Sequence, residues 1–259
     1  LVGAGLAAIL VACAGDEAML DPFGPPARTA ATIWWIMFWM GLVVYVIVMA
    51  LALMAFRRAR RRGVDEVSIH DRDQDTHPAA RRLVIYGGLV GPAIVLLVLN
   101  VVTTPMSAGI NDRGPTAAVG DDGVVIDVVA EKFWWRVDYP QFGVSTANEI
   151  HIPAGEPVQI RLTSPDVIHS FWIPKLAGKI DATPGHTTSL TLHADEPGRY
   201  RGRCTEYCGL AHAQMIVFVV AQERDEFDAW VEQQSQPQPE IVDERLAEGR
   251  QQFFGSSCV

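Results

Sequence analysis

Two long stretches in the first part of the chain contain no charged residue. The first covers residues 31–56 and is 26 residues long, and the second covers residues 83–104 and is 22 residues long. At a helical rise of about 1.5 Å per residue, each stretch is long enough to cross a hydrocarbon core of about 30 Å. Glycines in the second stretch are compatible with a membrane helix that packs closely on a neighbour. The pattern therefore predicts a transmembrane helical hairpin over residues 31–104.

The connector between the two stretches is strongly basic. Its arginines are Arg57, Arg58, Arg60, Arg61, Arg62, Arg72, Arg81 and Arg82. Because basic connectors stay in the cytoplasm, both ends of the hairpin are expected on the outer side. We therefore expect a two-pass protein of a bacterial inner (cell) membrane, with its C-terminal domain on the outer, periplasmic side.

From residue 124 the pattern changes to short runs rich in β-branched and aromatic residues, with Pro and Gly turn signals between them. These runs cover residues 124–130, 133–139, 149–153, 157–163, 187–193, 199–204 and 215–220. Many short strands at close spacing predict an all-β sandwich or Greek-key barrel. We place this domain at residues 120–222.

Two further segments follow the predicted β domain. Residues 224–233 have a helical pattern, and the Gln- and Pro-rich residues 234–239 are typical of a linker, so that helix and linker together occupy residues 223–239. Residues 241–254 again show a helical pattern, inside a final segment over residues 240–259. The linker indicates a domain boundary.

The composition fits a membrane protein with an acidic external part. Hydrophobic residues make up 49% of the chain, and the mean hydropathy of +0.15 is high for a soluble protein. The formal net charge is −9, and the part from Pro105 onward has 12 basic against 22 acidic residues. This acidic excess argues against nucleic acid as a partner and favours a basic protein.

The first 13 residues are apolar or small and end in Leu10-Val11-Ala12-Cys13. This ending resembles the lipobox at which a bacterial lipoprotein signal is cut before a lipidated cysteine. We therefore expect residues 1–13 to be a truncated lipoprotein-type signal peptide and Cys13 to be a lipidation site. The alternative is a chance cysteine in an apolar leader.

Soft metal ligands gather in one short stretch of the chain. Cys204 and Cys208 share a 12-residue stretch with His212 and Met215. Two thiolates, an imidazole and a thioether favour copper over hard cations such as Mg²⁺. One more nitrogen ligand is needed from elsewhere in the chain. His169 is the best candidate, because it lies at the predicted end of a strand and has apolar and aromatic neighbours in the sequence.

Three kinds of metal site remain open from the spacing alone. A structural zinc site would use the two cysteines and two histidines and would leave Met215 without a role. A blue-copper site would use one cysteine and leave the other thiol over. A pair of copper ions bridged by both thiolates would use every ligand. A purely structural cluster without metal is the fourth alternative.

Four ordered motifs make the chain resemble subunit II of cytochrome c oxidases. They are the C-x-E-x-C-G-x-x-H-x-x-M loop over residues 204–215, His169-Ser170-Phe171-Trp172-Ile173-Pro174, Lys179-Ile180-Asp181-Ala182-Thr183-Pro184-Gly185, and the aromatic run Glu131-Lys132-Phe133-Trp134-Trp135-Arg136-Val137-Asp138-Tyr139-Pro140. The resemblance covers about residues 31–222, including the hairpin, and the ordered combination is highly specific. It implies a membrane-anchored all-β protein, in which a two-helix transmembrane hairpin precedes a cupredoxin-like Greek-key β-sandwich.

The resemblance also implies two copper ions in a CuA centre. By motif position the ligands would be His169, Cys204, Glu206 (through its backbone carbonyl), Cys208, His212 and Met215. The two thiolates would bridge the ions, each imidazole would hold one ion, and Met215 would bind weakly opposite the Glu206 carbonyl. The strands would preorganise this geometry for electron transfer.

Further roles follow from the same resemblance. The Glu206 side chain would face the catalytic haem-copper subunit I and help to bind Mg²⁺ at that interface, with a solvated carboxylate as the alternative. Phe133, Trp134 and Trp135 would form the patch that receives electrons from cytochrome c. Aromatic residues that simply pack in the core are the alternative. Several family members have Trp where this chain has Phe133.

The C-terminal segment ends at Cys258-Val259, after a helical pattern. It resembles the opening of a cytochrome c domain, in which a helix leads into a C-x-x-C-H haem-attachment motif. We therefore expect a truncated cytochrome c domain at residues 240–259, with Cys258 as a haem c attachment residue and haem c held by the missing part. The alternative is an ordinary tail with an odd cysteine.

The function predicted from these features is electron transfer in a respiratory oxidase. Electrons would pass from cytochrome c, fused or soluble, to CuA and then to the haem-copper subunit that reduces O₂ to water, so the chain would not be catalytic alone. Rival functions are a membrane-tethered copper-binding or delivery protein and the CuA subunit of a nitric oxide or nitrous oxide reductase. A quinol oxidase subunit is disfavoured, because that branch is expected to lack the copper ligands that are present here.

Overall fold

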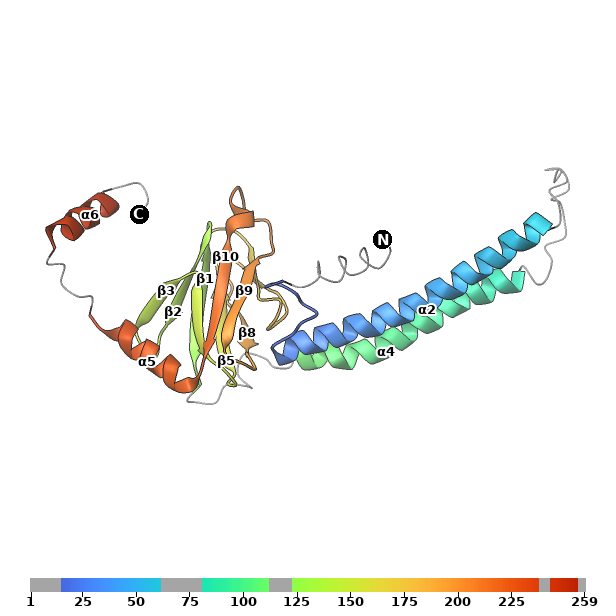
Figure 1. Ribbon diagram of the computed structural model, residues 1–259, viewed down its shortest axis with the longest axis horizontal. Helices are drawn as coiled ribbons and strands as arrows, with labels where there is room; N and C mark the ends of the chain where they lie inside the picture. The colour runs from blue at the N-terminus through green and yellow to red at the C-terminus, as the bar shows by residue number, and fades with distance from the viewer. Residues whose placement is uncertain (1–14, 62–80, 112–122, 238–242, 256–259) are drawn as a thin grey trace, which may run out of the picture.

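The computed structural model describes residues 15–61, 81–111, 123–237 and 243–255. Two long helices come first in the described part of the chain. Helix α2 (Pro25–Arg61) has 37 residues, and the π-helical turns of η2 (Leu83–Val90) continue directly into α4 (Gly91–Asn111). The two helices lie side by side in Figure 1. Both are long and apolar enough to cross a membrane, as predicted.

The apolar stretches and the helices differ at their ends. Helix α2 begins at Pro25, before the uncharged stretch, and it ends on a basic last turn with Arg58, Arg60 and Arg61. Basic side chains at a helix C-terminus complement the helix dipole. The helix is therefore longer than the part that composition assigns to the membrane.

The strands of the described residues form a sandwich of two five-stranded sheets (Figure 1). The first sheet has the order β3-β2-β1-β5-β8, with β3 (Val144–Ala147), β2 (Trp134–Tyr139), β1 (Val125–Glu131), β5 (Val158–Thr163) and β8 (Thr188–Leu192). The second has the order β4-β10-β9-β6-β7, with β4 (Glu149–Pro153), β10 (Ile216–Gln222), β9 (Gly198–Cys204), β6 (His169–Trp172) and β7 (Ile180–Ala182). The all-β prediction is confirmed.

Alternation of side chains explains how the sheets bury a core. In β10 every second residue is buried, so one face of the strand is apolar. Ile126 and Ile160 from the first sheet and Val217 and Val219 from the second are 0% exposed and belong to one cluster. Burial of this apolar surface is the main stabilising contribution to the sandwich.

All seven predicted strands are present, and three short ones were missed. Strands β3, β6 and β7 have only four, four and three residues, too few for a clear alternation of polar and apolar positions. One position also needs correction. His169 was expected at the end of a strand, but it is the first residue of β6, because the residues before it form a turn around Asp166.

Two helices follow the sandwich, close to the predicted positions. Helix α5 (Arg224–Ser235) inserts Phe227 into the core at 0% exposure. Its Trp230 stacks on the His151 ring of β4 with a centroid distance of 4.1 Å. Helix α6 (Glu244–Phe254) is capped by the Asp243 side chain, which accepts a hydrogen bond from the backbone N–H of Arg245.

Candidate metal centre

The predicted ligands lie on or beside three neighbouring strands of the second sheet, β10, β9 and β6, and in the loop between β9 and β10. Cys204 is the last residue of β9, and Met215 directly precedes β10, so the loop between them joins two adjacent strands. The backbone N–H of Cys204 donates to the carbonyl of Met215 at 2.9 Å and closes the loop. Strand β6 lies next to β9, which places His169 beside the same loop.

The two thiols and the two imidazoles lie close together. The sulfur atoms of Cys204 and Cys208 are 4.0 Å apart. His169 Nδ1 lies 3.9 Å from Cys204 Sγ, and His212 Nδ1 lies 3.6 Å from Cys208 Sγ. The ligand atoms of His169, Cys204 and Cys208 all lie within 4.8 Å of one another. Each thiol thus has its own imidazole.

Two weaker donors complete the cluster, one beside each thiol. The Cys204 thiol donates to the backbone carbonyl oxygen of Glu206 at 3.2 Å. Met215 Sδ lies 3.9 Å from Cys208 Sγ. The structure therefore brings together all six of the ligands expected from the sequence, and it divides them into two sets of three, one around each thiol.

Asp166 determines which nitrogen of His169 faces the thiols. Its Oδ1 lies 2.9 Å from His169 Nε2, which places the ring proton on Nε2 and leaves the lone pair of Nδ1 directed at the cluster. Burial works against ionisation of Asp166, but hydrogen bonds from His169, Val167 and Lys132 outweigh it and lower the pKa of the carboxyl to about 2. The sequence analysis missed Asp166, although an aspartate three residues before a ligand histidine is a readable signal.

Four of the five ligand side chains are shielded from water, and the fifth, His212, is half-buried. His169 and Met215 are 0% exposed, and Cys204 and Cys208 are buried. Burial and the nearby Cys204 thiol raise the pKa of Cys208 to about 11. In the metal-free chain this thiol therefore keeps its proton, and a metal ion has to displace it on binding.

The three aromatic residues of the predicted electron-accepting patch lie at different depths. Phe133 is half-buried, and its ring packs on the metal-binding loop at Gly209. Trp134 is also half-buried. Trp135 is 0% exposed, and its ring lies 6.3 Å from the His169 ring, so it is a core residue beside a ligand and does not reach the surface.

Exposed side chains surround the cluster. Glu206 is exposed, Tyr207 is 75% exposed and Leu210 is 99% exposed. The Tyr207 ring lies 5.7 Å from the His212 ring. Loop residues with large exposed apolar side chains are typical of a contact surface for another protein. The sequence analysis did not single out Tyr207 or Leu210.

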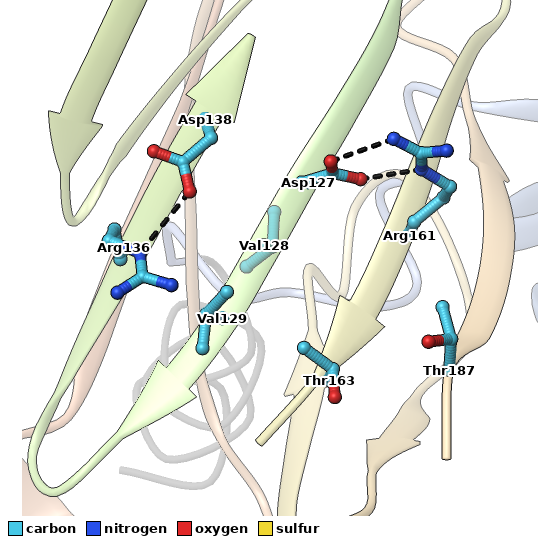
Figure 2. A pocket seen from close by; sticks show the side chains of 8 residues that line it. All are labelled: Asp127, Val128, Val129, Arg136, Asp138, Arg161, Thr163 and Thr187. Carbon is cyan, nitrogen blue, oxygen red and sulfur yellow. Dashed lines mark hydrogen bonds and ion pairs between the residues drawn. The ribbon is translucent and has the colours of Figure 1, made fainter. Parts of the chain in front are cut away.

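A separate groove of about 360 Å³ lies on the outer face of the first sheet (Figure 2). Its charges are paired with each other. Arg161 donates to both oxygens of Asp127, at 2.5 and 2.7 Å, and Arg136 donates to Asp138 at 3.2 Å. The first pair joins the neighbouring strands β5 and β1, the second lies within β2, and none of the metal ligands lines the groove.

An apolar helical hairpin, a β-sandwich and a buried cluster of soft ligands together define a membrane-anchored electron-transfer protein of the copper type. Residues 141–222 match the family described as "Cytochrome C oxidase subunit II, periplasmic domain". The "Cytochrome c oxidase subunit 2" of Alkalihalophilus pseudofirmus is 37% identical over 98% of this chain and 73% of its own length. The chain belongs to the cytochrome c oxidase subunit II family.

Two further proteins are similar to this chain. The "Quinol oxidase subunit 2" of Bacillus cereus is 27% identical over 96% of this chain and 83% of its own length. The crystal structure of the periplasmic domain of subunit II of cytochrome oxidase (CoxB) of Bradyrhizobium japonicum is 28% identical. It covers 46% of this chain and 96% of its own, with a TM-score of 0.43.

Proposed function

We propose that the chain receives electrons from cytochrome c at a dinuclear copper centre, CuA, and passes them to the haem-copper subunit. Membership of the family makes it a subunit of an oxidoreductase complex in a membrane, with subunit I as a partner. The observation that carries the proposal is the pairing of donors. Each thiol has its own imidazole, and the Glu206 carbonyl and Met215 lie beside different thiols.

This pairing favours two metal ions over one. A tetrahedral zinc ion would hold all four of its ligand atoms around a single point. His212 does not join the set of mutually close ligand atoms formed by His169, Cys204 and Cys208. Two copper ions between the thiols would use every donor and would suit the soft ligand set. The same complete set favours a cytochrome c oxidase over a quinol oxidase.

The residues of the chain would hold the centre in one geometry. When bound, the copper pair supplies one-electron redox chemistry. Strands β6, β9 and β10 fix the ligand backbone, and the hydrogen bond from Nε2 to Asp166 holds the His169 ring. Burial of four of the five ligand side chains limits the access of water, so little would reorganise when an electron arrives or leaves.

Electrons would enter through the half-buried aromatic residues beside the metal-binding loop. Phe133 packs on Gly209 of this loop and is half-buried, as is Trp134. These two residues would meet cytochrome c, while Trp135 would lie between them and His169. The acidic excess of the external part would attract a basic donor.

The exposed face of the loop would meet the catalytic subunit. Glu206 would contribute a carboxylate to a Mg²⁺ site at that interface, and Tyr207 and Leu210 would provide apolar contact. The external position of the β domain remains part of the proposal. Lipidation of Cys13 and haem attachment at Cys258 also remain proposals, since both residues lie outside the described parts of the chain.

The test is the copper content and the electron paramagnetic resonance spectrum of the full chain in detergent after copper loading. Two copper ions per chain, with hyperfine coupling to both nuclei, are the expected result. Cys208→Ser should abolish the two-copper signal, whereas His186→Ala should keep it, because His186 is exposed in a turn. One copper ion per chain, or preferential zinc binding, would reject the proposal and favour a copper-delivery protein.

A further inference from the structure

The segment over residues 15–28, which leads into α2 and includes its first turn, lies against the sandwich (Figure 1, dark blue). We call it the strap. The backbone N–H of Phe23 donates to the carbonyl of Lys175 at 2.7 Å, and the N–H of Asp195 donates to the carbonyl of Phe23 at 2.8 Å. The Phe23 ring packs on the Tyr200 ring with a centroid distance of 5.7 Å. The strap is thus joined to two separate loops of the domain.

Close backbone packing at Gly24 fixes the position of the strap on the domain. A Cβ atom at this position would lie 2.4 Å from the carbonyl oxygen of Leu176 and 2.6 Å from that of His193. Both neighbours are backbone atoms, so they cannot turn away as a flexible side chain would. Only glycine allows the strap to lie this close to the domain.

Ion pairs hold both ends of the strap. At one end Arg28, in the first turn of α2, forms a bidentate ion pair with Asp195. At the other end the Glu17 carboxylate lies 3.3 Å from Arg201 and 2.5 Å from Arg203. Pairs of this kind on a partly exposed surface contribute little to stability. They orient the strap, and the backbone contacts of Phe23 and Gly24 fix it.

The strap contacts the parts of the domain that carry the metal ligands. Arg203 directly precedes Cys204 in β9, and Lys175 lies shortly after β6, which begins at His169. On its other side the strap continues without a linker into α2, at Pro25. One short segment therefore connects the membrane helix to the ligand-bearing strand β9 and to the loop that follows β6.

We propose that the strap fixes the position of the copper centre relative to the membrane hairpin, with Glu17, Gly24 and Arg28 as positioning residues. The inference rests on the proposed function, because the position matters only if the centre passes electrons to a haem in another subunit. Electron transfer slows steeply as the distance between donor and acceptor grows. A domain that tilts on its hairpin would therefore transfer electrons more slowly, although its copper site stays intact.

The test compares two alanine variants in the strap of the assembled oxidase. Gly24→Ala introduces the backbone clash, and Gly15→Ala is the matched control, because no atom lies within 4 Å of a Cβ at that position. In Gly24→Ala we expect faster hydrogen exchange at the amides of Phe23 and Asp195 and an unchanged copper spectrum. We also expect haem reduction by the copper centre to be slower by about tenfold or more. Gly15→Ala should behave like the parent chain.

Other results of this experiment would contradict either the inference or the proposed function. Faster exchange with an unchanged rate of haem reduction would overturn the inference, and so would unchanged exchange in Gly24→Ala. If Gly24→Ala does not assemble, Arg28→Gln is the second variant, with haem reduction expected to be slower by about two- to fivefold. A parent chain without a two-copper signal would reject the proposed function instead, and the exchange data would still report whether the strap is locked.

Discussion

Asp166 Oδ1 lies 2.9 Å from Nε2 of His169 and thereby turns the other ring nitrogen, Nδ1, toward Cys204. Outer partners of this kind typically change metal affinity about 10- to 100-fold when they are removed. We therefore predict that Asp166→Ala weakens copper binding by about this factor, measured by competition with a chelator. Asp228→Ala, an exposed aspartate of α5, is the control. Equal affinities in the two variants would mean that packing alone orients His169.

Met215 is predicted to tune the reduction potential of the centre. Met215→Leu keeps the volume of this fully buried side chain, so its cost in folding free energy should stay below about 1.5 kcal/mol. It removes a weak electron donor, which should destabilise the oxidised centre and raise the reduction potential. The measurement is a redox titration of the copper-loaded chain. Met49→Leu in α2 should leave the potential unchanged, and a parental potential in Met215→Leu would exclude the thioether as a ligand.

Gly209 is predicted to be required for the shape of the metal-binding loop. Its φ of +134° is rarely adopted by other residues, and a Cβ atom there would lie 3.1 Å from two atoms of the Phe133 ring. Gly209→Ala should lower the free energy of unfolding by about 1–3 kcal/mol, measured by denaturant titration of the copper-loaded chain. Gly178→Ala is the control because its surroundings are open. Similar losses in both variants would contradict the prediction.

Phe227 is predicted to anchor α5 on the sandwich. Its side chain is 0% exposed and packs edge-on against Phe142. Phe227→Ala should lower the free energy of unfolding by about 3–5 kcal/mol, because it leaves a cavity in the core. Phe254→Ala, at an exposed position of α6, should change it by less than about 0.5 kcal/mol. Thermal unfolding of the two variants makes the comparison, and a small effect at Phe227 would show that α5 is not part of the cooperative fold.

Tyr139 is predicted to make the domain sensitive to strong alkali. Its buried hydroxyl accepts a hydrogen bond from the backbone N–H of His151 at 2.7 Å and donates to the carbonyl of the same residue at 3.0 Å. Burial raises the pKa of Tyr139, so the folded state keeps the phenol neutral. The unfolded chain releases this proton near pH 10, so stability is complete below about pH 10 and falls as the pH rises further.

The matched variant for this prediction is Tyr139→Phe. It leaves two backbone groups of His151 without their partner and should lower the free energy of unfolding at neutral pH by about 1–3 kcal/mol. Above about pH 10 its stability should fall less steeply than that of the parent chain. Denaturant titrations on both sides of that pH test the two statements. Parallel pH profiles would mean that another group controls the alkaline transition.

The sequence by itself determined the features that depend on local order along the chain. Uncharged stretches predicted both membrane helices, because crossing a bilayer requires a minimum length of apolar helix. Alternating apolar positions predicted seven of the ten strands. Cys204, Cys208, His212 and Met215 were readable together, since one loop carries them all and their side chains share a preference for soft metals.

Only the tertiary structure decided how distant residues meet. The backbone pairing of β6 with β9 places His169 beside Cys204, and the turn before β6 brings Asp166 to its ring. Burial of Trp135 also depends on the packing of both sheets, because an aromatic residue in a strand can face either side. The close contact between Gly24 and the carbonyl oxygen of Leu176 joins residues that are separated by more than half of the chain. Local patterns specify elements, whereas contacts between elements depend on the summed packing of the whole fold.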